Sequence, residues 1–183
     1  MISESSSFHT AIFDALCACL GLSKTSADAI ALIHEAYAEP ENVPQPPRNR
    51  NIIYWSALQE AGQEIPAAYV TEPDNTPGKT KPIVYVTLKY QLVVVCYGPA
   101  SEAYASRIRS MLFLDGHGLP RKILRDAGIF PVPDPPQPSI TYEDEGSLWR
   151  KRADLIISLR VRDEQQYGSI NAINVAPVTI IHH

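Results

Sequence analysis

The stretch Ile83–Leu112, IVYVTLKYQLVVVCYGPASEAYASRIRSML, decides how this chain is interpreted. Alternate residues from Val84 to Cys96 are apolar, and the residues between them are polar only in the middle of the run. This period-two pattern predicts a strand with one face buried throughout and the other covered at its ends. A strand of about 15 residues spans about 50 Å, whereas strands usually have about five or six residues. We expect it to extend beyond the core and to contact other subunits.

An amphipathic helix is predicted directly after this strand. Gly98 ends the strand, and Pro99 suits the first helical turn because its φ is fixed and it has no N–H to lose. Glu102 near the start, with Arg107 and Arg109 further along, agrees with the helix dipole. The expected apolar stripe is Ala100, Ala103, Tyr104, Ile108, Met111 and Leu112, and the expected outward face is Ser101, Ala105, Ser106, Arg109 and Ser110.

Five further elements follow from the same periodicities. They are a helix capped near Ser5–Ser7 and ended by Gly21, a strand over Asn51–Leu58, a helix over Leu119–Ala127, a half-buried strand over Ala153–Arg162, and a last strand over Ile170–Ile181. The last two strands are close in sequence and are expected to pair as a hairpin. Residues 27–38 are open to two interpretations: their alanines and glutamates favour a helix, and the prolines that follow favour a strand.

This mixture of elements predicts an α+β fold: a mixed, mainly antiparallel sheet with an unusually long strand, flanked by helices. We expect residues 1–183 to form a single domain with proline-rich arms near 40–50 and 131–138. Thr71–Pro82 has the composition of a mobile surface loop, cut first by proteases near Lys79 or Lys81.

Composition limits the classes of function. The chain has 183 residues, is 45% apolar and carries a formal net charge of −4, which argues against a nucleic-acid binder with a broad basic face. No apolar run is long enough to cross a membrane. Met1–Ser5 lacks the basic start of a signal peptide, and three cysteines do not make a disulfide framework. We therefore expect synthesis in a reducing cytoplasm, with no membrane association.

No group of residues predicts catalysis, a cofactor or a metal site. Cys17 and Cys19 are two apart on a helix, so their side chains diverge by roughly 200° and are expected to be packing residues. Cys96 with His117 could form a nucleophile and base, but Cys96 lies on the apolar face of the long strand. Asp115–Gly118 lacks the spacing of a dinucleotide-binding loop and is interpreted as a connection.

Two blocks of opposite charge flank Trp149. Glu143–Glu145 and Arg150–Arg152 are expected to pair with each other rather than to form an interaction surface. A helical turn within residues 145–152 would place Trp149 and Arg152 on one face, with the aromatic ring on the sheet, the guanidinium at a carboxylate or a carbonyl end, and Lys151 in solvent. His182 and His183 are given no function.

Several segments together resemble the phage neck/tail terminator (tail completion) family. The strand end Tyr97-Gly98-Pro99 with its helix resembles the aromatic-Gly step of that family, and Trp149 with Arg152 resembles the element that opens its next strand. Ile33–Tyr37, with the prolines after it, is similar to its first strand, although Ala38 and Glu39 follow where the family commonly carries Arg or Gln. The resemblance covers roughly residues 8–176 and favours a strand within 27–38.

This resemblance implies a structural virion protein that caps the tail tube and joins it to the neck connector. The implied partners are further copies in a ring, usually a hexamer, together with the tail tube protein and the connector protein. DNA would pass through the ring without specific binding. Two alternatives remain open: a monomeric α+β ligand-binding module with a pocket beside Trp55 or Trp149, and an enzyme that uses Cys96.

Charge is distributed unevenly along the chain, which suits such a ring. Residues 1–60 hold seven acids and three bases, a balance of −4, whereas residues 101–125 hold two acids and five bases, a balance of +3. Opposite signs on different faces favour head-to-tail contacts between neighbouring copies.

Overall fold

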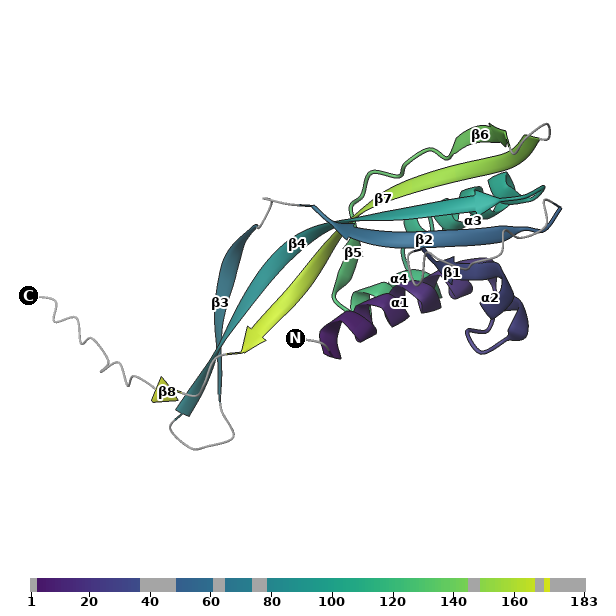
Figure 1. Ribbon diagram of the computed structural model, residues 1–183. Coiled ribbons are helices and arrows are strands. Elements are labelled where there is room, and N and C mark those ends of the chain that lie inside the picture. Colours follow the sequence, from purple (N-terminus) through teal and green to yellow (C-terminus); the bar gives the residue numbers. More distant parts are fainter. Residues whose placement is uncertain are drawn as a thin grey trace, which may run out of the picture. The chain divides into compact units, whose positions relative to one another are not determined.

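The computed structural model describes residues 3–36, 49–60, 65–73, 79–144, 149–166 and 170–171. Its elements (Figure 1) are α1 (Ser3–Leu20), α2 (Ala27–Leu32), β1 (Ile33–Glu35), β2 (Ile52–Gln59), β3 (Ile65–Pro73), β4 (Lys79–Tyr97), α3 (Ser101–Phe113), α4 (Leu119–Asp126), β5 (Ile129–Pro131), β6 (Ser139–Asp144), β7 (Trp149–Gln166) and β8 (Ile170–Asn171). The predicted α+β class is confirmed, and so is the long strand: β4 has 19 residues.

The central part of the sheet has the strand order β1-β2-β4-β7-β5. β1 pairs in parallel with β2, whereas β2 pairs with β4, and β5 and β6 pair with β7, in antiparallel register. The predicted Asn51–Leu58 and Ala153–Arg162 strands are therefore confirmed as parts of β2 and β7. β3, β5 and β6 were not anticipated, because two of them are short and β3 has no apolar alternation.

Helices cover one face of this sheet. Ile12 and Leu16 of α1, Ile108 of α3 and Leu124 of α4 are buried in one cluster with alternate residues of the strands. The strand members of the cluster are Ile33, Ile53, Trp55, Leu92, Val94, Cys96, Ile129, Ala153, Leu155, Ile157 and Leu159. The alternation predicted for β7 is therefore confirmed, because its intervening residues Ile156, Ser158 and Arg160 are exposed.

Gly98 lies between β4 and α3, as expected, but the buried face of α3 differs from the predicted one. Its buried residues are Ser101, Ala105, Ile108 and Leu112, whereas Ala103 is exposed. Spacings of four, three and four follow the 3.6-residue period more closely than the stripe that apolarity alone selected. Ser101 and Ala105 are small enough to pack closely against the sheet, so side-chain size outweighed hydrophobicity here.

Residues 27–38 contain both structures that the sequence allowed. Ser26 Oγ accepts the Ala29 N–H and begins α2, and the chain becomes extended at Ile33 to form β1. α1 and α4 form as expected, although α1 begins at Ser3 rather than near Ser5–Ser7. Among the described helices, none combines the length and apolarity needed to cross a membrane.

The described chain separates into two compact units: residues 1–63 with 88–161, and residues 64–87 with 162–183. The second unit contains β3 paired antiparallel with the first part of β4, and Arg162 over the Tyr85 ring at 3.5 Å. Thr71–Pro73 and Lys79–Pro82 are strand residues, so the predicted mobile loop over Thr71–Pro82 was wrong at both ends. Lys79 and Lys81 lie in β4, where their register partners are Asn171 and Glu72.

The predicted hairpin between the last two strands was also wrong. β8 pairs with β4, through Thr80↔Ile170, and not with β7. β3 also pairs with Thr80, so β8 lies on the other side of the first residues of β4. An open edge of the long strand was available, which proximity in sequence could not indicate. The rest of the predicted strand, to Ile181, lies outside the described residues.

The two proline-rich segments have different outcomes. Residues 37–48 lie outside the described residues, so the first arm stays a prediction. In the second, Pro131 belongs to β5, the Val132 N–H donates to Ser158 O, and Arg109 Nε donates to Pro136 O at 2.7 Å. The segment 131–138 is thus held on its own subunit.

Candidate functional site

The turn after β4 is built around Gly98. Its φ of +100° favours glycine, and its N–H donates to Lys151 O at 3.0 Å. A Cβ at this position would lie 2.7 Å from Arg50 O. Asn51 Oδ1 accepts the Ala100 N–H at 2.9 Å just beyond Pro99. The turn therefore joins the ends of β2, β4 and β7 to the start of α3.

Two arginines from β7 lie at the Tyr97 ring. The Arg150 and Arg152 guanidinium carbons are 4.5 Å and 5.6 Å from the ring centroid, within the distance of cation–π contacts. Burial raises the pKa of the Tyr97 phenol above its ordinary value. We call the group of Tyr97, Arg150, Arg152, Glu143 and Asp154 the Tyr97 cluster.

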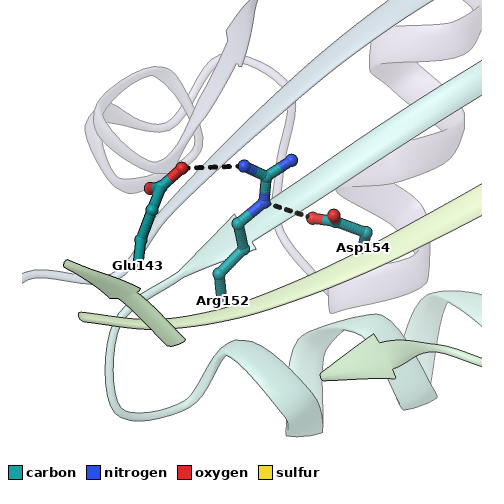
Figure 2. Close-up of polar contacts among 3 residues, drawn as sticks. All are labelled: Glu143, Arg152 and Asp154. Carbon is teal, nitrogen blue, oxygen red and sulfur yellow. Dashed lines mark hydrogen bonds and ion pairs between the residues drawn. The ribbon is translucent and has the colours of Figure 1, made fainter. Parts of the chain in front are cut away.

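Arg152 is fixed by two carboxylates (Figure 2). Its Nε donates to Asp154 Oδ1 at 2.7 Å, and its Nη1 donates to Glu143 Oε1 at 2.9 Å. The hydrogen bond to Asp154 is the main cause that raises the pKa of the Arg152 guanidinium, so the side chain stays charged. Asp154 is two residues along β7 and therefore on the same face. Glu143 comes from β6, where it is opposite Arg150.

The structure brings together only some of the five residues that carry the family resemblance, which are Tyr97, Gly98, Pro99, Trp149 and Arg152. The structure brings Tyr97, Gly98 and Arg152 together and places Pro99 in the turn beside them, but Trp149 begins β7 with its side chain 69% exposed. The predicted helical turn and the packing of Trp149 on the sheet were wrong, because residues three apart on a strand face opposite sides. Lys151 does not point to solvent: its Nζ lies 2.7 Å from Glu102 Oε2 of α3. The expected pairing between the two charge blocks is confirmed by Arg152 and Glu143.

A cavity of about 360 Å³ lies beside Trp55, between α1, α2 and β1. Its lining residues are His9, Thr10, Phe13, Ile30, Ile33, His34, Glu35 and Trp55. His9 Nδ1 and Glu35 Oε1 form a contact of 2.5 Å across it. The pocket that the sequence placed beside Trp55 or Trp149 is therefore present at Trp55, but His9 and Glu35 are 26 apart in sequence, so no local motif could have identified their contact.

The cysteines are core residues. Cys17, Cys19 and Cys96 are buried as free thiols, and burial raises their pKa to about 11, 12 and 12. Such thiols are protonated at neutral pH and are poor nucleophiles. Within the described ranges, no group of three His, Cys, Asp or Glu side chains is placed to hold a metal ion. Asp115–Gly118 connects α3 to α4, as expected.

The fold and the Tyr97 cluster define an α+β protein in which charged residues fasten strands and helices to one another. The chain belongs to the family described as phage neck terminator protein, whose family model matches residues 10–183. It is thus a structural phage protein of the neck and tail, and it is placed in the virion. No curated protein matches the chain.

Proposed function

We propose that this protein closes the end of the phage tail tube and joins it to the neck connector, as a ring of six copies. The observation that carries the proposal is the family match, which covers nearly the whole chain. The protein acts by contact with further copies, with the tail tube protein and with the connector protein, and it performs no catalytic step.

The central sheet supports a ring in two ways. Its strand order leaves β1 at one edge, and β5 and β6 lie beyond β7 toward the other edge. Its second face carries exposed or half-buried side chains such as Tyr54, Val95 and Ile156, which the helices do not cover. Two different edges on one subunit suit a heterologous contact, which closes into a ring when the rotation between copies allows it.

DNA passes through the ring without being held. Lysine and arginine side chains on the lumen would bind phosphates and release counterions, so each contact would strengthen binding. The negative balance of residues 1–60 would suit a lumen lining that avoids this. We therefore expect no retention of duplex DNA by the assembled ring in a gel-shift assay at physiological salt, and retention there would contradict this part of the proposal.

Electron microscopy of the protein mixed with uncapped tail tubes tests the main proposal. We expect density at one end of each tube with six-fold symmetry, and no density when the protein is first denatured by heat. A monomer by size-exclusion chromatography would not contradict the proposal, because the tube end can act as the template for the ring. Tubes that stay uncapped at every protein concentration would overturn it.

A further inference from the structure

Three large apolar side chains are exposed together on the β6–β7 ladder. Trp149, Tyr142 and Ile140 are 69%, 60% and 43% exposed. The register pairs Asp144 with Trp149, Tyr142 with Lys151 and Ile140 with Ala153, so all three lie on one face of the ladder. We call them the Trp149 patch. Exposed aromatic groups of this kind are enriched at protein–protein contacts.

The side of the sheet on which this patch lies follows from the parity of β7. Trp149 has the same parity as Ala153 and Leu155, which are buried under the helices, so the patch is on the helix side. The cavity beside Trp55 is on that same side, because Trp55 belongs to the core cluster. Patch and cavity therefore face the same way.

The strands that adjoin them, β1 and β6, lie at opposite edges of the central sheet (Figure 1). In the order β1-β2-β4-β7, with β6 beside β7, the cavity adjoins β1 and the patch adjoins β6. Four strand spacings separate these edges by about 19 Å. Trp55 is opposite Val94, whereas Lys151 is bonded to Gly98, just after the end of β4, so Trp149 also lies further along the strands than Trp55. A subunit cannot fill its own cavity with its own Trp149.

The cavity has the properties of a receiving site. Phe13, Ile30 and Ile33 supply apolar walls, and its volume suits a large side chain. Ile30 is 60% exposed, and the Trp55 Nε1–H, although buried, has no hydrogen-bond partner in the described part of the chain. A buried donor without an acceptor costs free energy, which an incoming carbonyl or carboxylate would recover.

Asp144 and Arg50 carry complementary charges at the two edges. Asp144, opposite Trp149 on the patch's own face, is exposed, whereas Glu143 lies on the other face and pairs with Arg152. Beside the cavity, the exposed Arg50 donates from Nη2 to Ala31 O at 3.3 Å, next to Ile30. Opposite charges at the rim of an apolar contact favour one orientation of the two partners.

We propose that Trp149 of one copy docks into the Trp55 cavity of the next copy, with Asp144 toward Arg50, and that this contact repeats around the ring. The inference rests on the proposed ring and names the surfaces that form it. The contact is heterologous, since patch and cavity are different surfaces of the same chain.

Cross-linking between engineered cysteines tests the contact. Ile30→Cys and Asp144→Cys place thiols at the two rims, and the three native thiols are buried and do not interfere. We expect a short bismaleimide to join the two single variants into dimers when they are mixed, and the double variant into a ladder ending at the ring. Neither single variant should cross-link with itself. The reaction is run both on tail tubes and in concentrated protein.

The outcomes separate this contact from the proposed function. Capped tubes with no cross-link in the double variant would overturn the contact and leave tube capping intact. Cross-linked rings that never bind tubes would support the contact and contradict tube capping. Self-cross-linking of a single variant would indicate a two-fold contact, which overturns the inference.

Substitution of Trp149 gives a second readout. Trp149→Ala should raise the concentration needed for ring formation at least tenfold, a roughly hot-spot-sized effect, with an unchanged circular dichroism spectrum. Phe130→Ala is the matched control, because Phe130 is a 40% exposed aromatic residue on β5, opposite Arg160. Asp144→Arg should weaken assembly, and Arg50→Asp in the same chain should restore it. Normal rings of Trp149→Ala that fail only to cap tubes would overturn the proposal and assign the patch to another neck or tail protein.

Discussion

The two faces of the central sheet are formed by the same strands but are different surfaces. Ile157 of β7 is fully buried beneath the helices, whereas its neighbour Ile156 is 52% exposed on the other face. The helix-covered face contains the core of this unit, and the open face contains the Tyr97 cluster. The difference teaches that burial, and with it the contribution to folding, alternates from one residue of a strand to the next. Substitutions in matched pairs can therefore test the two faces separately.

The largest effect is expected for the pair on β7. Ile157→Ala should lower the free energy of unfolding by about 2–5 kcal/mol, because it leaves a cavity in the core. Ile156→Ala should change it by less than about 0.5 kcal/mol. Urea unfolding followed by circular dichroism measures both. Equal losses would show that the open face is covered in the isolated subunit.

The next largest effect is expected at Gly98, in the turn between β4 and α3. Gly98→Ala should destabilise the fold by about 1–3 kcal/mol, because an L residue is strained at this φ and its Cβ would meet the Arg50 carbonyl. Gly116→Ala is the control, since the nearest atom to its Cβ is the flexible Arg121 Nη1 at 3.8 Å. Thermal unfolding compares them. Similar melting temperatures would mean that the turn adapts.

A smaller effect is expected on the open face. Arg152→Ala should cost about 1–2 kcal/mol, because it removes two charge-assisted hydrogen bonds and leaves Asp154 without its partner. Lys151→Ala should cost less than Arg152→Ala, because it breaks a single, solvent-screened ion pair with the half-exposed Glu102. Denaturant unfolding should rank them in that order, and the reverse order would assign the stabilising role to the contact with α3.

The smallest expected effect is an absence of reaction. Burial raises the pKa of Cys96 to about 12, so the thiol stays protonated at pH 8 and should be labelled by a maleimide only after unfolding. Val95→Cys adds a thiol on the open face, one residue away, which should react in the native protein. Mass spectrometry counts the labels. Rapid native labelling of Cys96 would revive an enzyme that uses this thiol.

The sequence correctly predicted those helices and strands that a local periodicity of apolar residues encodes. The alternation in β7 and the run of valines in β4 each fix an element without reference to the rest of the chain. The α3 stripe failed because apolar content does not reveal which small side chains a sheet requires beneath a helix. Ser101 is buried because its side chain is small, whereas the apolar pattern had placed it on the outward face of the helix.

The candidate site depended on contacts that are distant in sequence. That Arg152 meets a carboxylate was predicted from charge alone, but the choice of Glu143 and Asp154 depends on the β6–β7 register. A pocket beside Trp55 was named among the alternatives, but the exposure of Trp149 and the meeting of His9 with Glu35 had no local signal. The pairing of β8 with β4 was missed because proximity in sequence favours a hairpin unless another edge is open.

The central position of β4 has a consequence for synthesis of the chain. β4 is complete at Tyr97, but its neighbour β7 begins only at Trp149, so about 50 residues must be made before that edge can pair. Until then the edge through Val93, Val94 and Val95 is an unpaired β-rich template, the kind of segment that aggregates. Such long-range pairing also folds slowly. Yield of soluble protein should therefore depend on the rate of translation across residues 98–161 and on chaperones that cover this edge.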